Sequence, residues 1–130
     1  MEKGIYREEF VLDSEMDSKS SFEVLSKFLE SSDEYPTAIF ISSDAMAQGV
    51  IKAITQAGLS IPDDISLISF NDTMLSQNAM PPLSSVRVLQ REIADAAVRS
   101  MEEQRKGSVH PYKTVIPCVY IERNSVKNLK

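Results

Sequence analysis

The chain has 130 residues with 42% hydrophobic and 25% charged side chains, an ordinary balance for one globular domain, and its formal net charge at pH 7 is −5. The acidic balance and the dispersed basic residues argue against nucleic-acid binding by this chain itself. No apolar run is long enough for a membrane span and the N-terminus lacks the apolar stretch of a signal peptide, so we expect a cytoplasmic protein without membrane contact.

Nucleophiles and metal ligands are scarce. Cys118 is the only cysteine, which excludes an internal disulfide and a cysteine zinc site, and we expect a buried thiol within a strand. His110 is the only histidine and lies in a predicted surface loop, so no positioned base is evident for a catalytic serine. We therefore expect neither enzyme activity nor a bound metal or cofactor.

Short apolar runs alternate with helical patterns over the first seventy residues. A helix is predicted from Ser20, where Ser20 and Glu23 have the spacing of a capping box. A second helix is predicted after Asp44, which we expect to cap it, and this helix ends at Gly58. The order of strands and helices predicts a parallel sheet with right-handed crossovers. The predicted strands cover residues 10–12, 37–41 and 65–70.

The pattern changes after this third strand. Residues 74–82 have a loop-like composition, and residues 83–88 are a further predicted strand. Residues 91–106 carry apolar side chains at helical spacing. Residues 113–122 are the last predicted strand, in which Pro117 indicates an edge position or a bulge.

Polar clusters directly follow three of the predicted strands. In an open parallel sheet the carboxyl ends of neighbouring strands border one crevice, and ligands bind there. The residues alone therefore predict a small-molecule pocket. The three clusters are Ser14–Asp17, Ser42–Asp44 and Asn71–Thr73.

Each candidate residue also has a purely structural interpretation. Asp44 could be only a helix cap, although capping and ligand contact are compatible at a helix N-terminus. Ser43 could be only a turn residue, whereas Asn71 and Asp72 could close the strand in an Asx-turn or hydrogen-bond ligand hydroxyls. Met16 could belong to the core or cover the apolar face of a sugar or base.

Several spaced motifs in residues 36–88 occur in a fixed order, SSDAMA, IPDDIS, FND and PPLSSV, and IERNS follows near the C-terminus. They resemble the effector-binding domain of LacI/GalR-family transcription regulators, whose pattern is Asn-Asp-x-Met-Ala, Pro-Asp-Asp-Ile-Ser, Phe-Asp-Asp and Pro-Pro-Leu-Thr-Thr-Val. Nearly the whole chain is covered. The resemblance implies an α/β fold: a three-layer parallel sheet flanked by helices in a periplasmic-binding-protein-like lobe, beside an incomplete second lobe.

The resemblance also implies an effector site between two lobes. Met16 takes the place of an aromatic or apolar residue that packs on the effector. Ser43 stands where the family commonly has Asn, and Asn71 stands where it has the first Asp of Phe-Asp-Asp. Asp44 and Asp72 match the family directly. Because Ser43 is shorter than Asn and Asn71 is neutral, the identity of the effector does not carry over from any one member.

Three segments follow from the same resemblance. Residues 1–82 correspond to the C-terminal lobe, residues 83–107 to a crossover strand and helix of the other lobe, and residues 108–130 to a final returning strand and tail. We expect the strand at 83–88 to lack a parent sheet in this chain. The following helix should lack much of its packing partner, which favours association or disorder.

The resulting hypothesis is an effector-binding fragment of a sugar-responsive repressor that lacks its helix-turn-helix domain. Its partners would be a sugar or sugar derivative and a second copy in a homodimer, with operator DNA bound only through the absent N-terminal domain. With one wall of the pocket present, effector binding by the chain alone should be weak or absent. The alternatives are a periplasmic-type sugar-binding protein and a phosphoacceptor receiver domain, for which the required acidic pair and lysine are misplaced.

Overall fold

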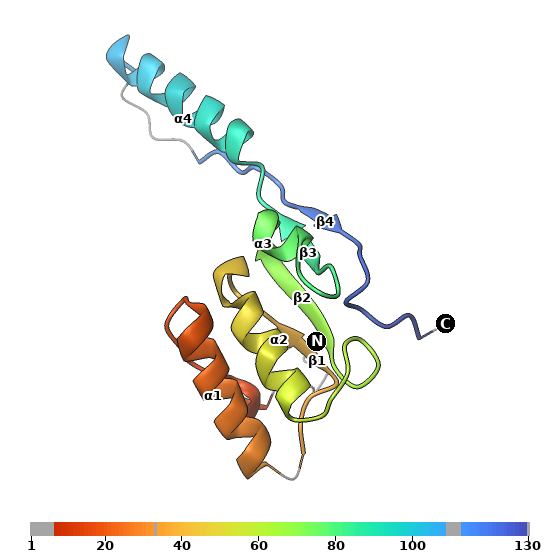
Figure 1. The fold of residues 1–130 in the computed structure, drawn as a ribbon. Coiled ribbons are helices and arrows are strands. Elements are labelled where there is room, and N and C mark those ends of the chain that lie inside the picture. The colour runs from red at the N-terminus through yellow and green to blue at the C-terminus, as the bar shows by residue number, and fades with distance from the viewer. Residues whose placement is uncertain (1–6, 33, 109–112, 130) are drawn as a thin grey trace.

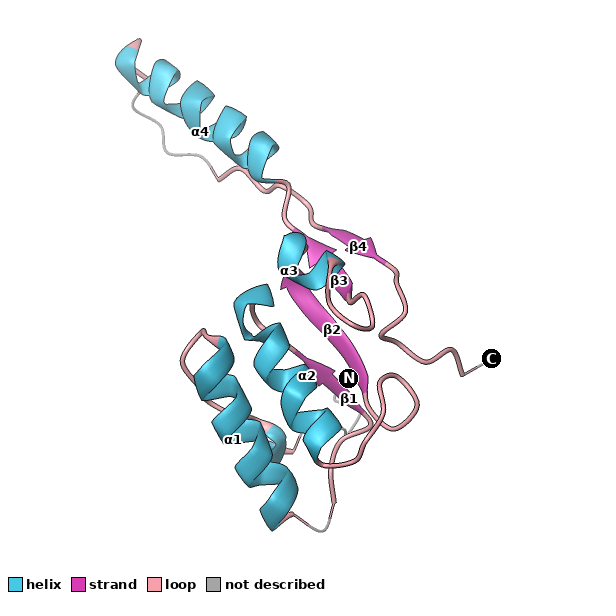
Figure 2. Cartoon of the chain, viewed as in Figure 1, coloured by secondary structure: helices cyan, strands magenta, loops and turns pink. Residues whose placement is uncertain are grey.

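The computed structural model describes residues 7–32, 34–108 and 113–129. Its centre is a four-stranded sheet in the order β1-β2-β3-β4, shown in Figures 1 and 2. The first three strands are parallel, and β4 is antiparallel to β3. A mostly parallel sheet flanked by helices is the α/β architecture that the sequence predicts. The strands are β1 (Ala38–Phe40), β2 (Ser66–Asn71), β3 (Ser84–Arg87) and β4 (Val119–Ile121).

Helices α1 and α2 lie side by side, whereas α4 projects away from the rest of the molecule (Figure 1). The short helix α3 follows β2 directly. The helices are α1 (Ser18–Ser31), α2 (Ala47–Gln56), α3 (Met74–Gln77) and α4 (Gln90–Arg105), and two short 3-10 helices are η1 (Glu8–Phe10) and η2 (Asp44–Met46).

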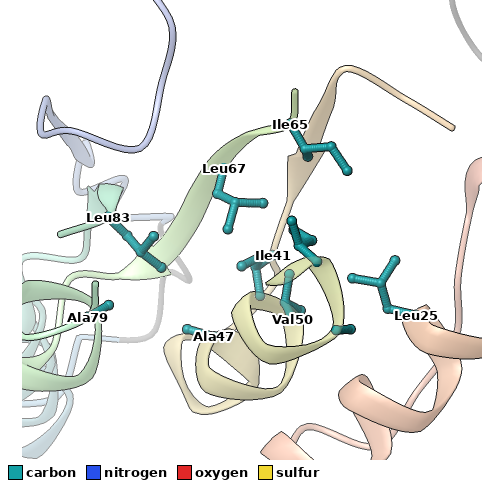
Figure 3. Packing of buried hydrophobic residues seen from close by; sticks show 10 residues of the cluster. Leu25, Ile41, Ala47, Val50, Ile65, Leu67, Ala79 and Leu83 are labelled. Atoms are coloured by element: carbon teal, nitrogen blue, oxygen red, sulfur yellow. The ribbon is translucent and has the colours of Figure 1, made fainter. Parts of the chain in front are cut away.

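One hydrophobic core joins α1, α2 and the sheet (Figure 3). Side chains of α2 at helical spacing meet alternating side chains of β2, because those two periodicities each place apolar groups on one face. Burial of each large aliphatic side chain stabilises the fold by about 1.5–3 kcal/mol. The buried hydrophobic residues are Leu25, Ile41, Ala47, Val50, Ala53, Ile54, Ile65, Leu67, Ala79 and Leu83.

A glycine allows α1 and α2 to approach closely. A β-carbon at Gly49 would overlap the backbone carbonyl oxygen of Ser18 and the hydroxyl of Ser21. In that space the Ser21 hydroxyl donates a 3.0 Å hydrogen bond to the carbonyl of Met46. The start of α2 is thereby bonded to α1.

The N-terminal part differs from the prediction in two ways. The expected strand at residues 10–12 is absent, since residues 8–10 form η1 and residues 11–15 have no regular structure. Helix α1 begins at Ser18 and is capped by Asp17, whose carboxylate accepts hydrogen bonds from the backbone N–H groups of Lys19 and Ser20, both at 2.8 Å. The predicted capping role of Ser20 is therefore wrong, because an acidic residue with extended backbone lies three positions earlier.

The second half corrects the prediction about the strand at 83–88. Strand β3 pairs in parallel with β2, with Asn71 opposite Arg87, so it has a parent sheet in this chain. It joins that sheet because Leu83, which precedes β3, is fully buried in the same core. Helix α4 has no buried residue, as expected for a helix that lacks much of its packing partner, and residues of its one side face Thr114 and Ile116. The assignment of residues 83–107 to another lobe stays a prediction.

The last predicted strand is much shorter than expected. Of residues 113–122, the structure gives strand geometry only to Val119–Ile121. Cys118 is exposed, so the prediction of a buried thiol is wrong, because the segment before β4 leaves the sheet toward α4. His110 lies outside the described residues. Among the helices of the described ranges, none has the length and apolar character needed to cross a membrane.

Candidate functional site

The carboxyl ends of β1, β2 and β3 lie along one edge of the sheet. Ser43 follows β1, Asn71 ends β2, and Arg87 ends β3 as the register partner of Asn71. In parallel sheets this edge is where crevices for ligands form. Two of the predicted site residues, Ser43 and Asn71, thus follow neighbouring paired strands.

Ser43 begins the short helix after β1. Its backbone is extended, with φ −154°, and its hydroxyl accepts a hydrogen bond from the backbone N–H of Ala45 at 3.4 Å. This is the capping position that the sequence predicts for Asp44. The cap is one residue earlier because the carboxylate of Asp44 is turned toward other donors.

Asp44 is 1% exposed and accepts four hydrogen bonds from within the chain. One oxygen, Oδ1, accepts from the hydroxyl of Ser69 on β2. The other, Oδ2, accepts from the backbone N–H and the hydroxyl of Thr73, at 2.5 and 2.8 Å, and from the hydroxyl of Ser76 on α3, at 3.0 Å. A buried carboxylate requires such donors, and here they join η2, β2 and α3.

The side chain of Asp72 is fully enclosed and paired with two arginines. Arg87 Nε lies 2.7 Å from Oδ2, and Arg123 Nη2 lies 2.7 Å from Oδ1. Arg123 also donates from Nη1 to the carbonyl of Leu83 at 2.6 Å. Oδ2 thus accepts a hydrogen bond from Arg87 on the third strand, whereas Oδ1 is ion-paired with Arg123, after the fourth strand, and accepts no hydrogen bond from the described residues.

The backbone between these two carboxylates is unusual. Asn71 has φ 101° and Asp72 has φ 58°, so two successive residues are left-handed. Asn and Asp are the non-glycine residues that adopt this region most readily. The turn is held by a 3.2 Å bond from the Asp72 N–H to the Ser85 hydroxyl and a 3.0 Å bond from Gln77 Nε2 to the Asp72 carbonyl.

The amide of Asn71 differs from the two carboxylates. Its side chain is half-buried and has no hydrogen-bond partner within the ranges that the structure describes. An amide carries both donors and an acceptor, which suits hydroxyl groups. Asn71 is the predicted site residue whose polar atoms are most available.

Met16 stands apart from the other four predicted residues. It precedes α1 and is 63% exposed. No hydrogen bond in the described part of the chain links the loop around Met16 to Ser43 or Asn71. The structure thus brings Ser43, Asp44, Asn71 and Asp72 to one edge of the sheet and leaves the contribution of Met16 as a prediction.

Several residues that organise this edge were not singled out from sequence. Ser69 was read as part of an apolar strand, and Ser76 as part of a loop. Arg87 received no separate interpretation, and Arg123 was assigned to a solvated C-terminal tail, which its 17% exposure contradicts. A polar side chain inside the apolar run ISLISF was the signal available for Ser69. For the arginines no local pattern exists, because their partner Asp72 is 15 and 51 positions away.

A large cavity lies elsewhere. It has a volume of about 740 Å³ and lies between residues 7–14, α1 and β1. Its lining is mostly apolar, and none of the five predicted site residues contributes to it. Such a lining suits packing of apolar groups better than recognition of a polyol. In the described ranges, no three His, Cys, Asp or Glu side chains are grouped closely enough to hold a metal ion.

Comparison with known proteins identifies the relatives of this chain. The family described as "periplasmic binding protein-like domain" matches residues 1–126. The lactose operon repressor of Rhizobium radiobacter is 39% identical over 92 residues, which are 71% of this chain and 81% of that sequence. The chain belongs to the LacI/GalR family. A transcriptional regulator GalR of Streptococcus thermophilus is 40% identical over 104 residues, which are 80% of this chain and 31% of the relative.

Solved structures agree with this membership. A LacI-family regulator from Sanguibacter keddieii superposes with a TM-score of 0.84 at 25% identity, over 92% of this chain and 46% of that one. The lac repressor dimer bound to operator and an anti-inducer gives a TM-score of 0.78 at 26% identity, over 85% and 38%. The chain thus spans less than half of these regulators and corresponds to part of their periplasmic-binding-protein-like domain.

Proposed function

We propose that the chain forms one wall of the effector pocket of a sugar-responsive LacI/GalR-type repressor and acts as a binding module without enzyme activity. The observation that carries this proposal is the edge formed by the ends of β1 and β2. There the amide of Asn71 is without a partner among the described residues, and the hydroxyl-bearing Ser43 follows β1, the strand paired with β2. A sugar presents hydroxyl groups that such neutral side chains bind.

The proposed contacts are divided by chemistry. Asn71 donates to and accepts from sugar hydroxyls, and Ser43 adds a further hydroxyl at the neighbouring strand end. Met16 supplies an apolar surface for one face of the sugar ring, in keeping with its exposure and flexible side chain. Neutral hydrogen bonds are weaker than charge-assisted ones, so each contact contributes modestly.

The regulatory context is also a proposal. The operator-bound lac repressor dimer supports a homodimer that acts on operator DNA, for which we propose a cytoplasmic location. DNA contact would come from regions of the regulator outside these residues, since the chain carries a net charge of −5. Effector binding would change the balance between two arrangements of the regulator.

A titration followed by NMR tests the pocket. With one wall present, we expect a dissociation constant on the order of millimolar for the best sugar, which corresponds to about −4 kcal/mol. Lactose, ribose and cellobiose should be added to the ¹⁵N-labelled chain at up to about 100 mM. One of them should shift the amide signals of Asn71 and Ser43 in a saturable way.

Two variants make the titration specific. Asn71→Gly removes the amide while keeping a residue that tolerates positive φ, and it should abolish the saturable shifts. Asn78→Ala removes an exposed amide in the loop after α3 and should leave them unchanged. If all three sugars, tested on the native chain, leave the strand-end signals unmoved, the proposal that this wall binds a sugar through Asn71 and Ser43 is wrong.

A further inference from the structure

Asp44 and Asp72 match the family motif, yet their geometry gives them a different task from ligand contact. We infer that both are positioning residues: they hold the left-handed Asn71–Asp72 turn, and the effector contacts of this wall come from the neutral Asn71 and Ser43. The ligand part of this inference rests on the proposed function. The part about the turn concerns the free chain and stands independently of any ligand.

The carboxylate of Asp44 has little capacity left for a ligand. Its Oδ2 accepts three hydrogen bonds, two from Thr73 and one from Ser76, and its Oδ1 accepts one from Ser69. The residue is almost completely buried. A sugar hydroxyl could reach it only by displacing one of these donors, which would leave a buried polar group without a partner.

Asp72 is committed in another way, through ion pairs rather than through a full set of hydrogen bonds. Two guanidinium groups engage its two oxygens at 2.7 Å each, and its side chain has no exposed surface. Two positive charges against one negative charge leave this cluster with a net positive charge. Asp72 therefore presents no free carboxylate to the crevice, although its motif position implies one.

These contacts converge on the backbone of the turn. A left-handed conformation costs a residue with a β-carbon roughly 1–2 kcal/mol, and here two such residues are adjacent. The turn persists because the backbone on its C-terminal side is fixed: Ser85 accepts the Asp72 N–H, Gln77 donates to the Asp72 carbonyl, and Asp44 accepts the Thr73 N–H. Asp44 thus acts on Asn71 through Thr73, the second residue after it.

The residues of this edge therefore divide into those that contact the ligand and those that hold the turn. Asn71, the last residue of β2, is the one member of the turn whose side chain is uncommitted among the described residues, and its direction depends on the turn. Loss of the support should misplace the amide without removing any atom that touches the ligand. That distinguishes a positioning residue from a ligand-binding residue.

The test compares two substitutions at position 44. Asp44→Ala removes all four acceptor interactions. Asp44→Asn keeps the shape: its carbonyl oxygen can face the three donors of Thr73 and Ser76, while its amide donates to the hydroxyl of Ser69. A positioning role predicts rescue by Asn, whereas a charged ligand contact predicts loss with both.

Two readouts are measured on each chain. Residual dipolar couplings and three-bond couplings report φ of Asn71 and Asp72 without ligand, and the lactose, ribose and cellobiose titrations report affinity. Asp44→Ala should lose the positive φ values and weaken binding of the responding sugar at least tenfold. Asp44→Asn should keep both φ values and bind the responding sugar within about threefold of the native affinity. In this variant each hydrogen bond to the charged carboxylate is replaced by a neutral hydrogen bond rather than lost.

Other variants keep the inference falsifiable if Asp44→Ala does not fold. Ser76→Ala removes one donor to Asp44 and should perturb the couplings of Thr73 and Asn71 by an intermediate amount. Asp95→Asn removes the same charge on the exposed α4 and should change neither readout. If Asp44→Asn keeps the φ values yet loses the sugar response, Asp44 is a ligand contact and the inference is overturned.

The failure of each proposal is recognisable. If the native chain shows no sugar response but Asp44→Ala still loses the positive φ values, the proposed function fails and the positioning role stands. If Asp44→Ala keeps both φ values and the native sugar affinity, the positioning role fails and the proposed function stands.

Discussion

Carboxylates with the same chemistry have different tasks in this chain according to their surroundings. Asp44 and Asp72 are buried and bonded to donors from distant segments, whereas Asp64 is exposed and closes a local turn. In that turn Asp64 Oδ2 accepts from the Ser60 hydroxyl at 2.6 Å and from the Ser60 N–H at 2.8 Å. These bonds favour the ionised form.

The turn predicts a pH dependence. The Ser60 hydroxyl, and then the Ser60 backbone N–H, lower the pKa of Asp64 below its usual value. Because the folded pKa is depressed, the stabilisation is fully present above the unfolded pKa of about 3.9 and is lost as the pH falls through the folded pKa. Asp64→Asn should therefore flatten the dependence of the unfolding free energy on pH below about pH 4.

NMR titration of the Asp64 carboxyl carbon measures the same effect directly. Ser60→Ala keeps the carboxylate and removes its first donor, so the pKa of Asp64 should move upward. An unchanged titration in Ser60→Ala would show that the hydroxyl is not the cause.

A second residue-scale prediction concerns Arg123. Its side chain is 17% exposed and pairs with the enclosed Asp72. Removing one partner of a buried ion pair leaves a charge with fewer donors, so Arg123→Met should lower the unfolding free energy by about 3 kcal/mol in urea denaturation. Lys127→Met removes an exposed cation that lies 3.5 Å from Asp63 and should cost less than about 1 kcal/mol. An equal loss of unfolding free energy in Arg123→Met and Lys127→Met would contradict the claim that burial makes the Arg123 ion pair the stronger one.

The sequence located the candidate edge but not the roles within it. Ser43, Asp44, Asn71 and Asp72 were found because strand ends and polar clusters are local features. Which of them contact a ligand and which hold the turn depends on Ser76, Arg87 and Arg123. Folding brings Ser76 to Asp44 and brings the two arginines to Asp72. No spacing rule relates residues that are tens of positions apart.

At the scale of elements, the contact between α1 and α2 depends on one missing side chain. Gly49→Ala should lower the unfolding free energy by about 2 kcal/mol, because the added methyl group meets the backbone carbonyl of Ser18 as well as the Ser21 hydroxyl. This cost exceeds the helix propensity of Ala over Gly, about 1 kcal/mol, which acts in the opposite direction.

Two variants control this experiment by thermal and urea denaturation. Gln48→Ala is exposed on the same helix and should change stability by no more than about 0.5 kcal/mol. Ser21→Ala added to Gly49→Ala should restore only part of the loss, since the backbone of Ser18 stays in place. Stabilisation by Gly49→Ala would show that the two helices separate readily.

Element prediction succeeded where periodicity was strong. The helix after Asp44 and the strand at 65–70 were both placed within a few residues of α2 and β2. The strand at 10–12 failed because three apolar residues carry too little pattern and pair with no neighbour in the described structure. The start of α1 was misplaced because Asp17 and Ser20 are both good caps and only geometry separates them.

At the scale of the whole molecule, α4 is the least supported element. Its 16 residues include none that are buried, and Ile93, Val98 and Met101 are exposed on it. Isolated helices of this length are marginal in water. Its amide hydrogens should therefore exchange within seconds to minutes near neutral pH, whereas those of α2 and β2 should be protected to nearly the global stability.

Hydrogen exchange at several protein concentrations checks this prediction. Protection of α4 that rises with concentration would mean that a second copy covers the apolar side chains. Protection of α4 equal to that of α2 in dilute monomer would contradict the prediction. Ile93→Gln should leave the protection of α2 unchanged in either case, because no described residue of α4 belongs to the hydrophobic core that contains α2.

The register of β3 and β4 has a topological consequence. Arg87 and Val119 are opposite one another in an antiparallel pair, so everything between them is an insertion into a β-hairpin. A two-residue Asn-Gly turn could join the two strands directly and delete residues 88–118. Closing a loop of two residues instead of about thirty lowers the entropic cost by roughly 2 kcal/mol. Strands β3 and β4 thus form a β-hairpin with residues 88–118 inserted between them. A variant without these residues would be a shorter scaffold that keeps Ser43 and Asn71 in place.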